Sequence, residues 1–149
     1  MQKSLIIGLV LACTGTSLSA QNAVQLSRAV FVERFSADFG GNTIERATEF
    51  RKGETVVFVV EWQTAPTDSP FAVSSPIPKT LQYRGSSHDA QAVSVDGGRN
   101  WGTIGALTIS DQYGLRLASP EDVTHLRWTI SANTAANGNG QFTYSAIVR

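Results

Sequence analysis

The sequence is short of cysteine and of charge, and it carries no excess of either sign. Its 149 residues include one cysteine, 12 Lys+Arg and 12 Asp+Glu. A single cysteine cannot form a disulfide within the chain, so the domain must be stabilised by its core. The balanced charge leaves no surplus of cations for a phosphate backbone, which argues against nucleic-acid binding. With charged residues at 16% and apolar residues at 42%, the composition is that of a folded chain.

Also missing is an apolar run of about 20 residues, the length that a membrane-spanning helix needs. A shorter apolar run covers residues 5–12, with Lys3 before it and small or polar residues after it up to Ala20. This layout predicts a secretory signal peptide over residues 1–20, cleaved after Ala20. Residues 21–149 would then form one exported domain without a membrane span, located in the periplasm, at the cell surface or outside the cell.

The one cysteine, Cys13, stands at the end of this apolar run. Residues 10–13 (VLAC) loosely resemble a lipobox, the motif in which bacterial lipoproteins carry a lipidated cysteine. Lipid anchoring through Cys13 is therefore the alternative to cleavage after Ala20. Cleavage after Ala20 would leave a mature chain without cysteine, which excludes a thiol nucleophile and a thiolate metal site.

Beyond residue 20 the sequence has no long stretch in which apolar residues recur with the 3.6-residue period of a helix. Apolar and polar residues alternate with a period of two instead, as they do in strands. Glycine, asparagine and proline separate the alternating segments at short intervals. The pattern predicts an all-β fold, an immunoglobulin-like antiparallel β-sandwich of seven to nine short strands, with a closed barrel as the alternative. Strands are predicted over residues 29–34, 55–62, 71–75, 81–84, 91–95, 107–110, 123–130 and 141–148. Residues 35–52 are predicted to form a polar loop, with a helical turn over residues 43–50.

Two of these segments carry the clearest core signal. Residues 55–62 (TVVFVVEW) are apolar on both faces, as expected for a strand at the centre of a packed core, and Phe58 is predicted to be buried. In residues 123–130, Leu126 and Trp128 alternate with basic side chains. Because buried basic side chains would need polar partners, the Leu126 and Trp128 face is predicted to point inward.

Four short motifs follow one another after residue 50. They are residues 53–58 (GETVVF), 75–83 (SPIPKTLQY), 94–101 (SVDGGRNW) and 140–144 (GQFTY). Their order and spacing resemble a bacterial extracellular module, the conserved repeat domain (domain of unknown function 11), although Ser75 stands where that family usually has aspartate. The resemblance covers about residues 51–149 and leaves residues 21–50 as an N-terminal extension with its own strand. It implies an immunoglobulin-like sandwich on exported or cell-surface proteins, and no enzymatic activity.

The third motif also fits an Asp-box, a structural turn of sialidases and related exported proteins. In such a turn the short Asp96 side chain accepts backbone N–H bonds, Gly98 takes a positive φ, and the ring of Trp101 packs beneath. Ser94, Asp96, Gly98 and Trp101 are therefore predicted to form a structural hairpin. A calcium or glycan contact is the alternative, although one carboxylate cannot supply the 6–8 oxygens that calcium takes.

No catalytic motif or metal-binding pattern stands out in the sequence. It has no nucleophile elbow and no phosphate-binding loop. The two histidines lie far apart, without cysteines that could complete a zinc site. The acidic residues of the N-terminal half have arginine or lysine nearby, as solvated ion pairs do. We therefore predict no catalytic residue, no metal and no cofactor, with a small hydrolase as a weaker alternative.

These observations favour a non-catalytic exported module with a structural or interaction role at the bacterial cell envelope. The alternative is a carbohydrate-binding module in which Trp101, Tyr83 and Tyr113 stack against sugar rings. Residues 23–34 are too apolar for an exposed tail, so they are predicted to pair with a sheet edge. That edge belongs either to the same domain, or to a second copy or another envelope protein.

Overall fold

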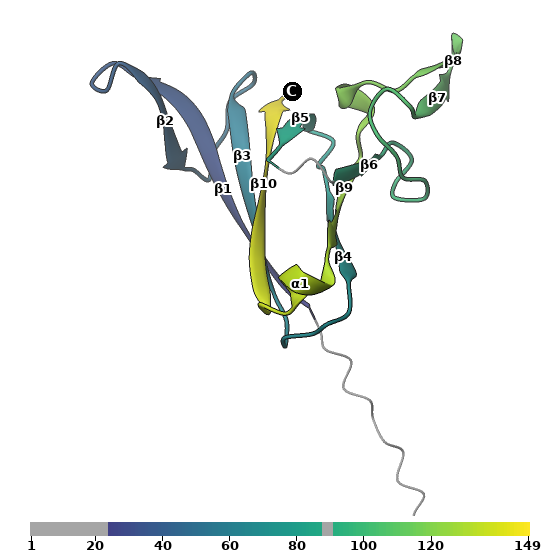
Figure 1. Cartoon of the computed structure of the whole chain (residues 1–149). Helices are drawn as coiled ribbons and strands as arrows, with labels where there is room; N and C mark the ends of the chain where they lie inside the picture. The colour runs from purple at the N-terminus through teal and green to yellow at the C-terminus, as the bar shows by residue number, and fades with distance from the viewer. Residues whose placement is uncertain (1–23, 88–90) are drawn as a thin grey trace, which may run out of the picture.

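The computed structural model describes residues 24–87 and 91–149, which fold into an all-β sandwich (Figure 1). The predicted signal peptide over residues 1–20 and Cys13 lie outside the described residues. The elements are β1 (Gln25–Ser36), β2 (Gly41–Arg46), β3 (Thr55–Gln63), β4 (Phe71–Pro76), β5 (Leu81–Ser86), β6 (Gln91–Ser94), β7 (Thr108–Asp111), β8 (Gly114–Leu117), the 3-10 helix η1 (Pro120–Asp122), β9 (His125–Ile130), α1 (Ala132–Ala135) and β10 (Asn139–Val148).

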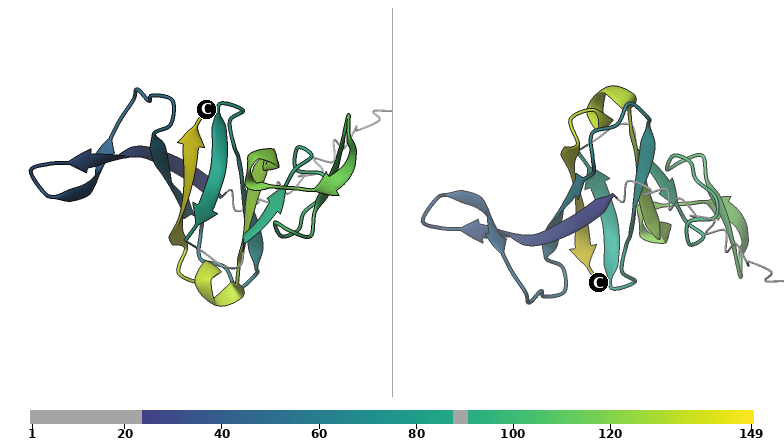
Figure 2. Two further views of the ribbon diagram at one scale, coloured as in Figure 1. Left: turned by 90° about the horizontal axis from the view of Figure 1, so that it is seen from above. Right: turned by 90° about the horizontal axis from the view of Figure 1, so that it is seen from below.

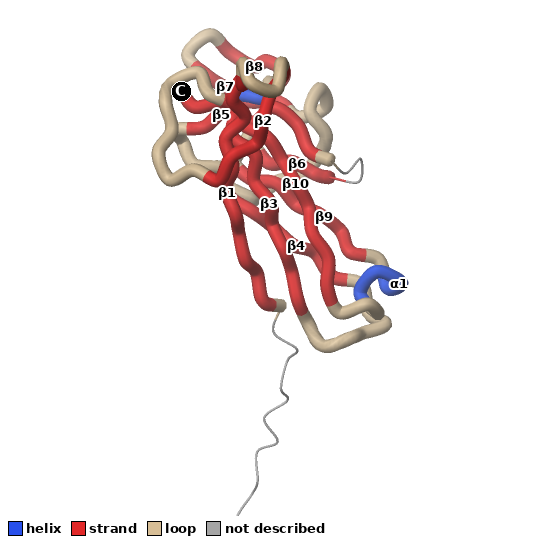
Figure 3. The backbone as a smooth tube through the Cα atoms, turned by 90° about the vertical axis from the view of Figure 1, so that its left-hand side faces the viewer, coloured by secondary structure: helices blue, strands red, loops and turns tan. Residues whose placement is uncertain are grey.

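Two antiparallel sheets form the sandwich. Five strands in the order β2-β1-β3-β10-β5 make the larger sheet, and β4, β9 and β6 make the smaller one, with β9 at its centre. In the part of the chain that the structure describes, β7 and β8 pair only with each other and form a separate hairpin. Figure 3 shows α1 at one end of the sandwich and the β7–β8 hairpin at the other. The strands that the sequence pattern did not predict are β2 and β8.

Strand β3 shows why this sequence builds two layers. Alternate residues from Val56 to Trp62, among them Phe58, are buried between the sheets. On the opposite face Val57 and Val59 are only half-buried. The expectation of two packed faces is therefore wrong for the outer face, because the smaller sheet covers one side of β3 only.

Aromatic side chains of the two sheets meet in the core. The Trp128 ring of β9 stacks on Phe142 of β10 with ring centroids 4.8 Å apart. Within the larger sheet, Phe58 of β3 stacks on Tyr144 of β10 at 4.7 Å. Trp128 and Leu126 are almost completely buried. The predictions that Phe58 is a core residue and that the Leu126 and Trp128 face points inward are confirmed.

The prediction of a polar loop over residues 35–52 with a helical turn is wrong in part. Residues 43–50 form no helical turn, because Gly41–Arg46 is strand β2 and pairs with β1. The turn before it ends at Gly40, whose φ of 63° lets the chain reverse sharply into β2. The short helix α1, whose N-terminus is capped by the Ser131 side chain, lies between β9 and β10, where the sequence pattern predicted no element.

The N-terminal strand is built into the larger sheet. In β1, the residues from Gln25 to Glu33 pair with β3 of the same chain. From β1, Arg28 reaches the smaller sheet, where its Nη2 donates a hydrogen bond to the buried Ser75 Oγ of β4 at 2.6 Å. The segment that precedes the four motifs is thus joined to them by a strand pairing and by a contact between the sheets.

Candidate functional site

Two hairpins project from the sandwich and carry much of its exposed apolar surface. β1 is twelve residues long, and its residues 34–36 extend past the start of β3 and pair with β2 alone. Figure 2 shows the β1–β2 hairpin on one side of the sandwich and the β7–β8 hairpin on the opposite side. Side chains at these positions have no second layer against which to pack.

The β1–β2 hairpin exposes three large apolar side chains. Phe35 is 73% exposed, Phe39 82% and Ile44 61%. The sequence pattern predicts a polar loop here, so none of these three exposed side chains was anticipated. The sequence signal that could have found the hairpin is the alternation of period two, which continues through Phe35 toward the Gly40-Gly41 turn. Burying such a side chain contributes about 1.5–3 kcal/mol. Their concentration on one hairpin marks it as a candidate contact surface.

An ion pair and a hydrogen bond fix the hairpin at its base. The Arg34 guanidinium lies between two carboxylates, 3.1 Å from Glu54 and 3.6 Å from Glu45. The backbone N–H of Arg51 and then the Arg34 guanidinium lower the pKa of Glu54. Arg34 therefore connects β1 to β2 and to the start of β3, which sets the direction in which the hairpin projects.

Strand β2 forms an edge of the larger sheet. It pairs with β1 on one side, from Phe31 opposite Arg46 to Ser36 opposite Gly41. No strand among the described residues pairs with its other side. Of the features that commonly protect an edge, the strand has two charged side chains, Glu45 and Arg46, but it has no proline, no lysine and no bulge in its pairing with β1. Its outward backbone groups are therefore open to another strand.

The β7–β8 hairpin is tied down more firmly. It exposes Tyr113, Leu115 and Leu117. The Arg116 guanidinium donates a hydrogen bond to the Asp111 carboxylate at 2.9 Å. It also forms a bidentate salt bridge with Asp122 of η1, with hydrogen bonds of 2.8 and 2.9 Å. The Arg116 guanidinium is the main cause of the lowered pKa of Asp122. This arginine holds the hairpin against η1.

The Asp96 side chain accepts four hydrogen bonds within the loop that follows β6. Its Oδ1 accepts from the backbone N–H groups of Arg99 and Asn100 and from the Ser94 hydroxyl at 2.8–3.0 Å, and its Oδ2 accepts from the Asn100 amide at 2.6 Å. The buried Ser94 Oγ accepts from the Gly98 N–H at 2.9 Å. These donors, the Asn100 N–H first, hold the pKa of Asp96 well below its usual range. A calcium ion at Asp96 would have to compete with four hydrogen bonds.

Trp101 packs against this loop. A Cβ added to Gly98 would lie 3.6 Å from the Trp101 ring. The Arg127 guanidinium lies over the ring, 4.2 Å from its centroid, and His125 approaches edge-on at 6.4 Å. One face of the ring that was predicted to stack on a sugar is therefore covered by Arg127.

The structure does not assemble the three predicted glycan-binding aromatics into one platform. Tyr83 lies on β5, packs against the core, and its hydroxyl accepts from Gln91 Nε2 at 2.9 Å. Burial raises the pKa of Tyr83. Tyr113 stands alone at the tip of the β7–β8 hairpin, 89% exposed. Trp101 belongs to the loop after β6, so the three rings come from three separate parts of the fold.

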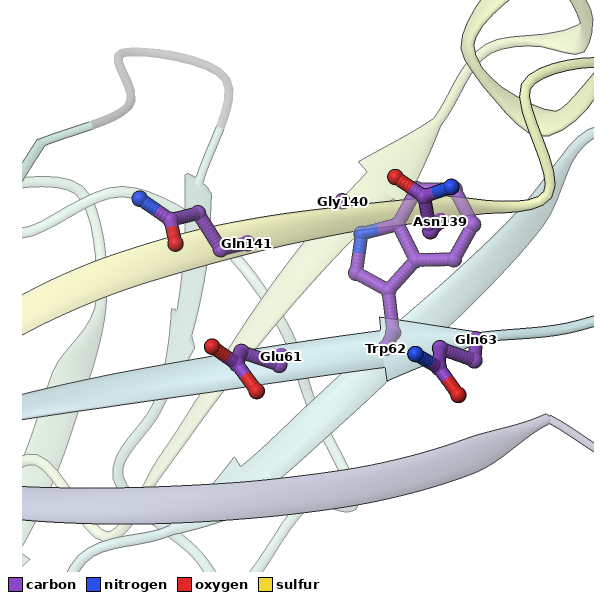
Figure 4. Close-up of a pocket in the computed structure, with 6 residues that line it drawn as sticks. All are labelled: Glu61, Trp62, Gln63, Asn139, Gly140 and Gln141. Atoms are coloured by element: carbon purple, nitrogen blue, oxygen red, sulfur yellow. The ribbon is translucent and has the colours of Figure 1, made fainter.

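A polar hollow of about 380 Å³ lies over β3 and β10 (Figure 4). It is lined by Glu61, Trp62, Gln63, Asn139, Gly140 and Gln141. The three amides can donate and accept hydrogen bonds, and Glu61 accepts from Ser27 at 3.0 Å. The lining places neither a second carboxylate nor a nucleophile beside Glu61, so its chemistry is that of hydrogen bonding.

No group of three or more His, Cys, Asp or Glu side chains gathers as a metal site within residues 24–87 and 91–149. His125 Nδ1 lies 3.1 Å from Thr124 Oγ1, and His88 is outside the described residues. In the same ranges no helix has the length and apolar character needed to cross a membrane.

No protein-family model, no curated protein and no solved structure matches the chain. Any function assigned to it therefore rests on its own residues and on their arrangement.

Proposed function

We propose that this chain is a non-catalytic, exported module of the bacterial cell envelope that binds other proteins through its β1–β2 hairpin. The observation that carries this proposal is the exposure of Phe35, Phe39 and Ile44 on a hairpin that projects beyond the sandwich. When a partner covers these apolar side chains, the release of water from them makes the free energy of binding more favourable. The open edge of β2 can add main-chain hydrogen bonds to the partner.

The resemblance to the conserved repeat domain supports the exported and non-catalytic part of this proposal; it does not extend over the β1–β2 hairpin. All four motifs fall on the sandwich: the first begins β3, the second joins β4 to β5, the third is the Asp96 loop, and the fourth lies in β10. That family is immunoglobulin-like and occurs on exported and cell-surface proteins. The signal-peptide pattern over residues 1–20 supports export, and Cys13 offers lipid anchoring as the alternative to release.

The test is a quantitative pull-down of envelope proteins from the source bacterium on the immobilised exported protein. The double variant Phe35→Ser/Phe39→Ser is expected to capture at least tenfold less of a specific partner than the wild type, because aromatic anchors dominate binding energies. Tyr113→Ser, an equally exposed aromatic on the opposite hairpin, is the matched control and should bind as the wild type does. Equal capture by the double variant and the wild type would contradict the proposal.

A second candidate function is the binding of a glycan in the hollow of Figure 4, rather than at the predicted aromatics. The observation that favours it is the cluster of Gln63, Asn139 and Gln141 around Glu61, which matches the hydroxyl groups of a sugar in hydrogen-bonding capacity. Glycan-array binding that is lost in Gln141→Ala and retained in Tyr113→Ser would support this function. Binding that is unchanged in Gln141→Ala would exclude this hollow.

A further inference from the structure

We propose that β2 pairs antiparallel with β2 of a second copy of this chain, around a two-fold axis that passes perpendicular to the sheet at Ile44. The inference rests on the proposed function, because it names the partner that the β1–β2 hairpin binds. The two larger sheets then join into one continuous sheet through main-chain hydrogen bonds. Such an interface is closed, because the same edge is used on both copies.

A two-fold axis at Ile44 fixes every other pair along the strand. Ile44 lies opposite Ile44 of the second copy, Asn42 opposite Arg46, and Thr43 opposite Glu45. An axis perpendicular to the sheet keeps both outer faces on the same side, so the exposed Ile44 side chains meet directly. An axis at Glu45 would set two carboxylates opposite each other, and an axis at Thr43 would set Ile44 opposite Asn42. The axis at Ile44 is the one that pairs apolar with apolar and faces no like charges.

The charge of Arg46 favours the same register. Opposite Arg46 lies Asn42 of the second copy, and the Asn42 amide donates to Glu33 Oε1 at 2.8 Å within its own hairpin. The Arg46 guanidinium lies over the Phe31 ring of its own chain, 5.5 Å from its centroid. By turning across the new strand pair it would reach the Glu33 carboxylate of the other chain. This pairing occurs twice, once on each side of the axis.

The charge of Glu45 is complemented in the same way on the inner face. Opposite Glu45 lies Thr43 of the second copy, and Thr43 is the register partner of Arg34 on β1. The Glu45 carboxylate therefore approaches a second arginine besides the Arg34 of its own chain.

An anionic lipid surface fits the hairpin less well, because acidic residues outnumber basic residues between positions 33 and 54.

Cysteine cross-linking tests the register. In the full chain carrying Cys13→Ser, a cysteine introduced by substitution is the only thiol. Ile44→Cys is expected to form a disulfide-linked dimer under mild oxidation, because directly opposite Cβ atoms lie about 4.5–5.5 Å apart. Thr43→Cys and Glu45→Cys should each cross-link poorly alone and efficiently when mixed. The proposal is overturned if Ile44→Cys cross-links no better than Tyr113→Cys, or if the mixture gives no more dimer than its components.

Sedimentation equilibrium tests whether the edge drives association without a cross-link. The wild type is expected to dimerise reversibly, and Ile44→Lys, which sets two ammonium groups opposite each other, to weaken the dimer at least tenfold. Ile44→Thr keeps a β-branched side chain and serves as the conservative control, with an intermediate dimer. Thermal unfolding of each variant verifies that the sandwich remains folded.

The two proposals fail in different ways. A wild type that stays monomeric at the highest measurable concentration overturns the second-copy inference, and the proposed function survives if Phe35→Ser/Phe39→Ser still loses a captured partner. If that double variant also captures every partner normally, both proposals are overturned. Dimerisation that Ile44→Lys does not weaken overturns the β2 edge as the interface.

Discussion

The indole of Trp62 lies so close to the backbone of Gly140 that a Cβ on residue 140 would sit 2.6 Å from Trp62 Cζ2. The two residues are directly opposite in the pairing of β3 with β10, and Trp62 is almost fully buried. Only glycine permits this approach, because any Cβ at position 140 would force the ring or the backbone to shift. The contact positions the floor of the hollow in Figure 4.

Gly140→Ala is therefore expected to destabilise the sandwich by about 1–3 kcal/mol, the range for overpacking a well-filled core. Urea unfolding followed by tryptophan fluorescence measures the change. Gly85→Ala on β5 is the matched control, since nothing lies within 4 Å of its added Cβ and its φ is not positive. Equal stability of the two variants would show that Trp62 can move aside without cost.

Trp128→Ala is expected to cost roughly 3–5 kcal/mol of unfolding free energy. The ring stacks on Phe142, contacts Tyr144, and its Nε1 donates to Ser86 Oγ at 3.3 Å. This loss approaches the whole stability of a domain, about 5–15 kcal/mol. Calorimetry should show a strongly lowered melting temperature, whereas the exposed Tyr113→Ala should change stability by no more than about 0.5 kcal/mol. A comparably small change in Trp128→Ala would contradict the burial of this ring between the sheets.

Strands that bury one face were predictable because burial imposes an alternating sequence pattern. β9 shows this, with Trp128 at the expected inward position. β3 was predicted instead from a run that is apolar on both faces, of which only the Phe58 face is buried. β2 lacks that signal, because its apolar residue Ile44 is exposed and its neighbours are charged or polar. Its strand conformation follows from pairing with β1, a relationship between segments that a local pattern does not encode.

The candidate site was less predictable than the fold for the same reason. The sequence marks Trp101 as an aromatic residue next to a turn, which fits a stacking platform. The residue that covers it, Arg127, comes from β9, and only the pairing of β6 with β9 brings the two together. Conversely, the exposed Phe39 lies in a stretch whose composition resembles a polar loop. Only the extension of β1 beyond the start of β3 shows that the hairpin that carries Phe39 projects from the sandwich.

Asp96 is expected to contribute to stability against acid. Its hydrogen bonds lower its pKa in the folded protein, whereas the pKa of an aspartate in an unfolded chain is about 3.9. A group whose pKa is lower in the folded state adds stability above its unfolded pKa, and that stability is lost as the pH falls toward the folded value. The melting temperature of the wild type should therefore drop below about pH 4.

Asp96→Asn should lower the melting temperature at pH 7 and make it less dependent on acid. The substituted amide removes the charge and turns one acceptor into a donor that faces the donors of Asn100. Melting curves between neutral and acidic pH measure both effects, with Asp38→Asn on the hairpin tip as the control. The acid dependence persists in part, because Glu54, Asp111 and Asp122 also have lowered pKa values. An unchanged pH profile in Asp96→Asn would contradict the role of its carboxylate.

Cleavage after Ala20 is expected to give a mature protein that begins at Gln21. The basic Lys3, the apolar run and the small residues before Ala20 predict this site, and the first described strand begins after it, at Gln25. Intact-mass spectrometry of the exported protein measures the N-terminus directly. Cys13→Ser should leave the mature mass unchanged, because residue 13 is removed with the leader. A wild-type mass that includes acyl chains on Cys13, absent from the Cys13→Ser variant, would instead establish a lipid-anchored protein.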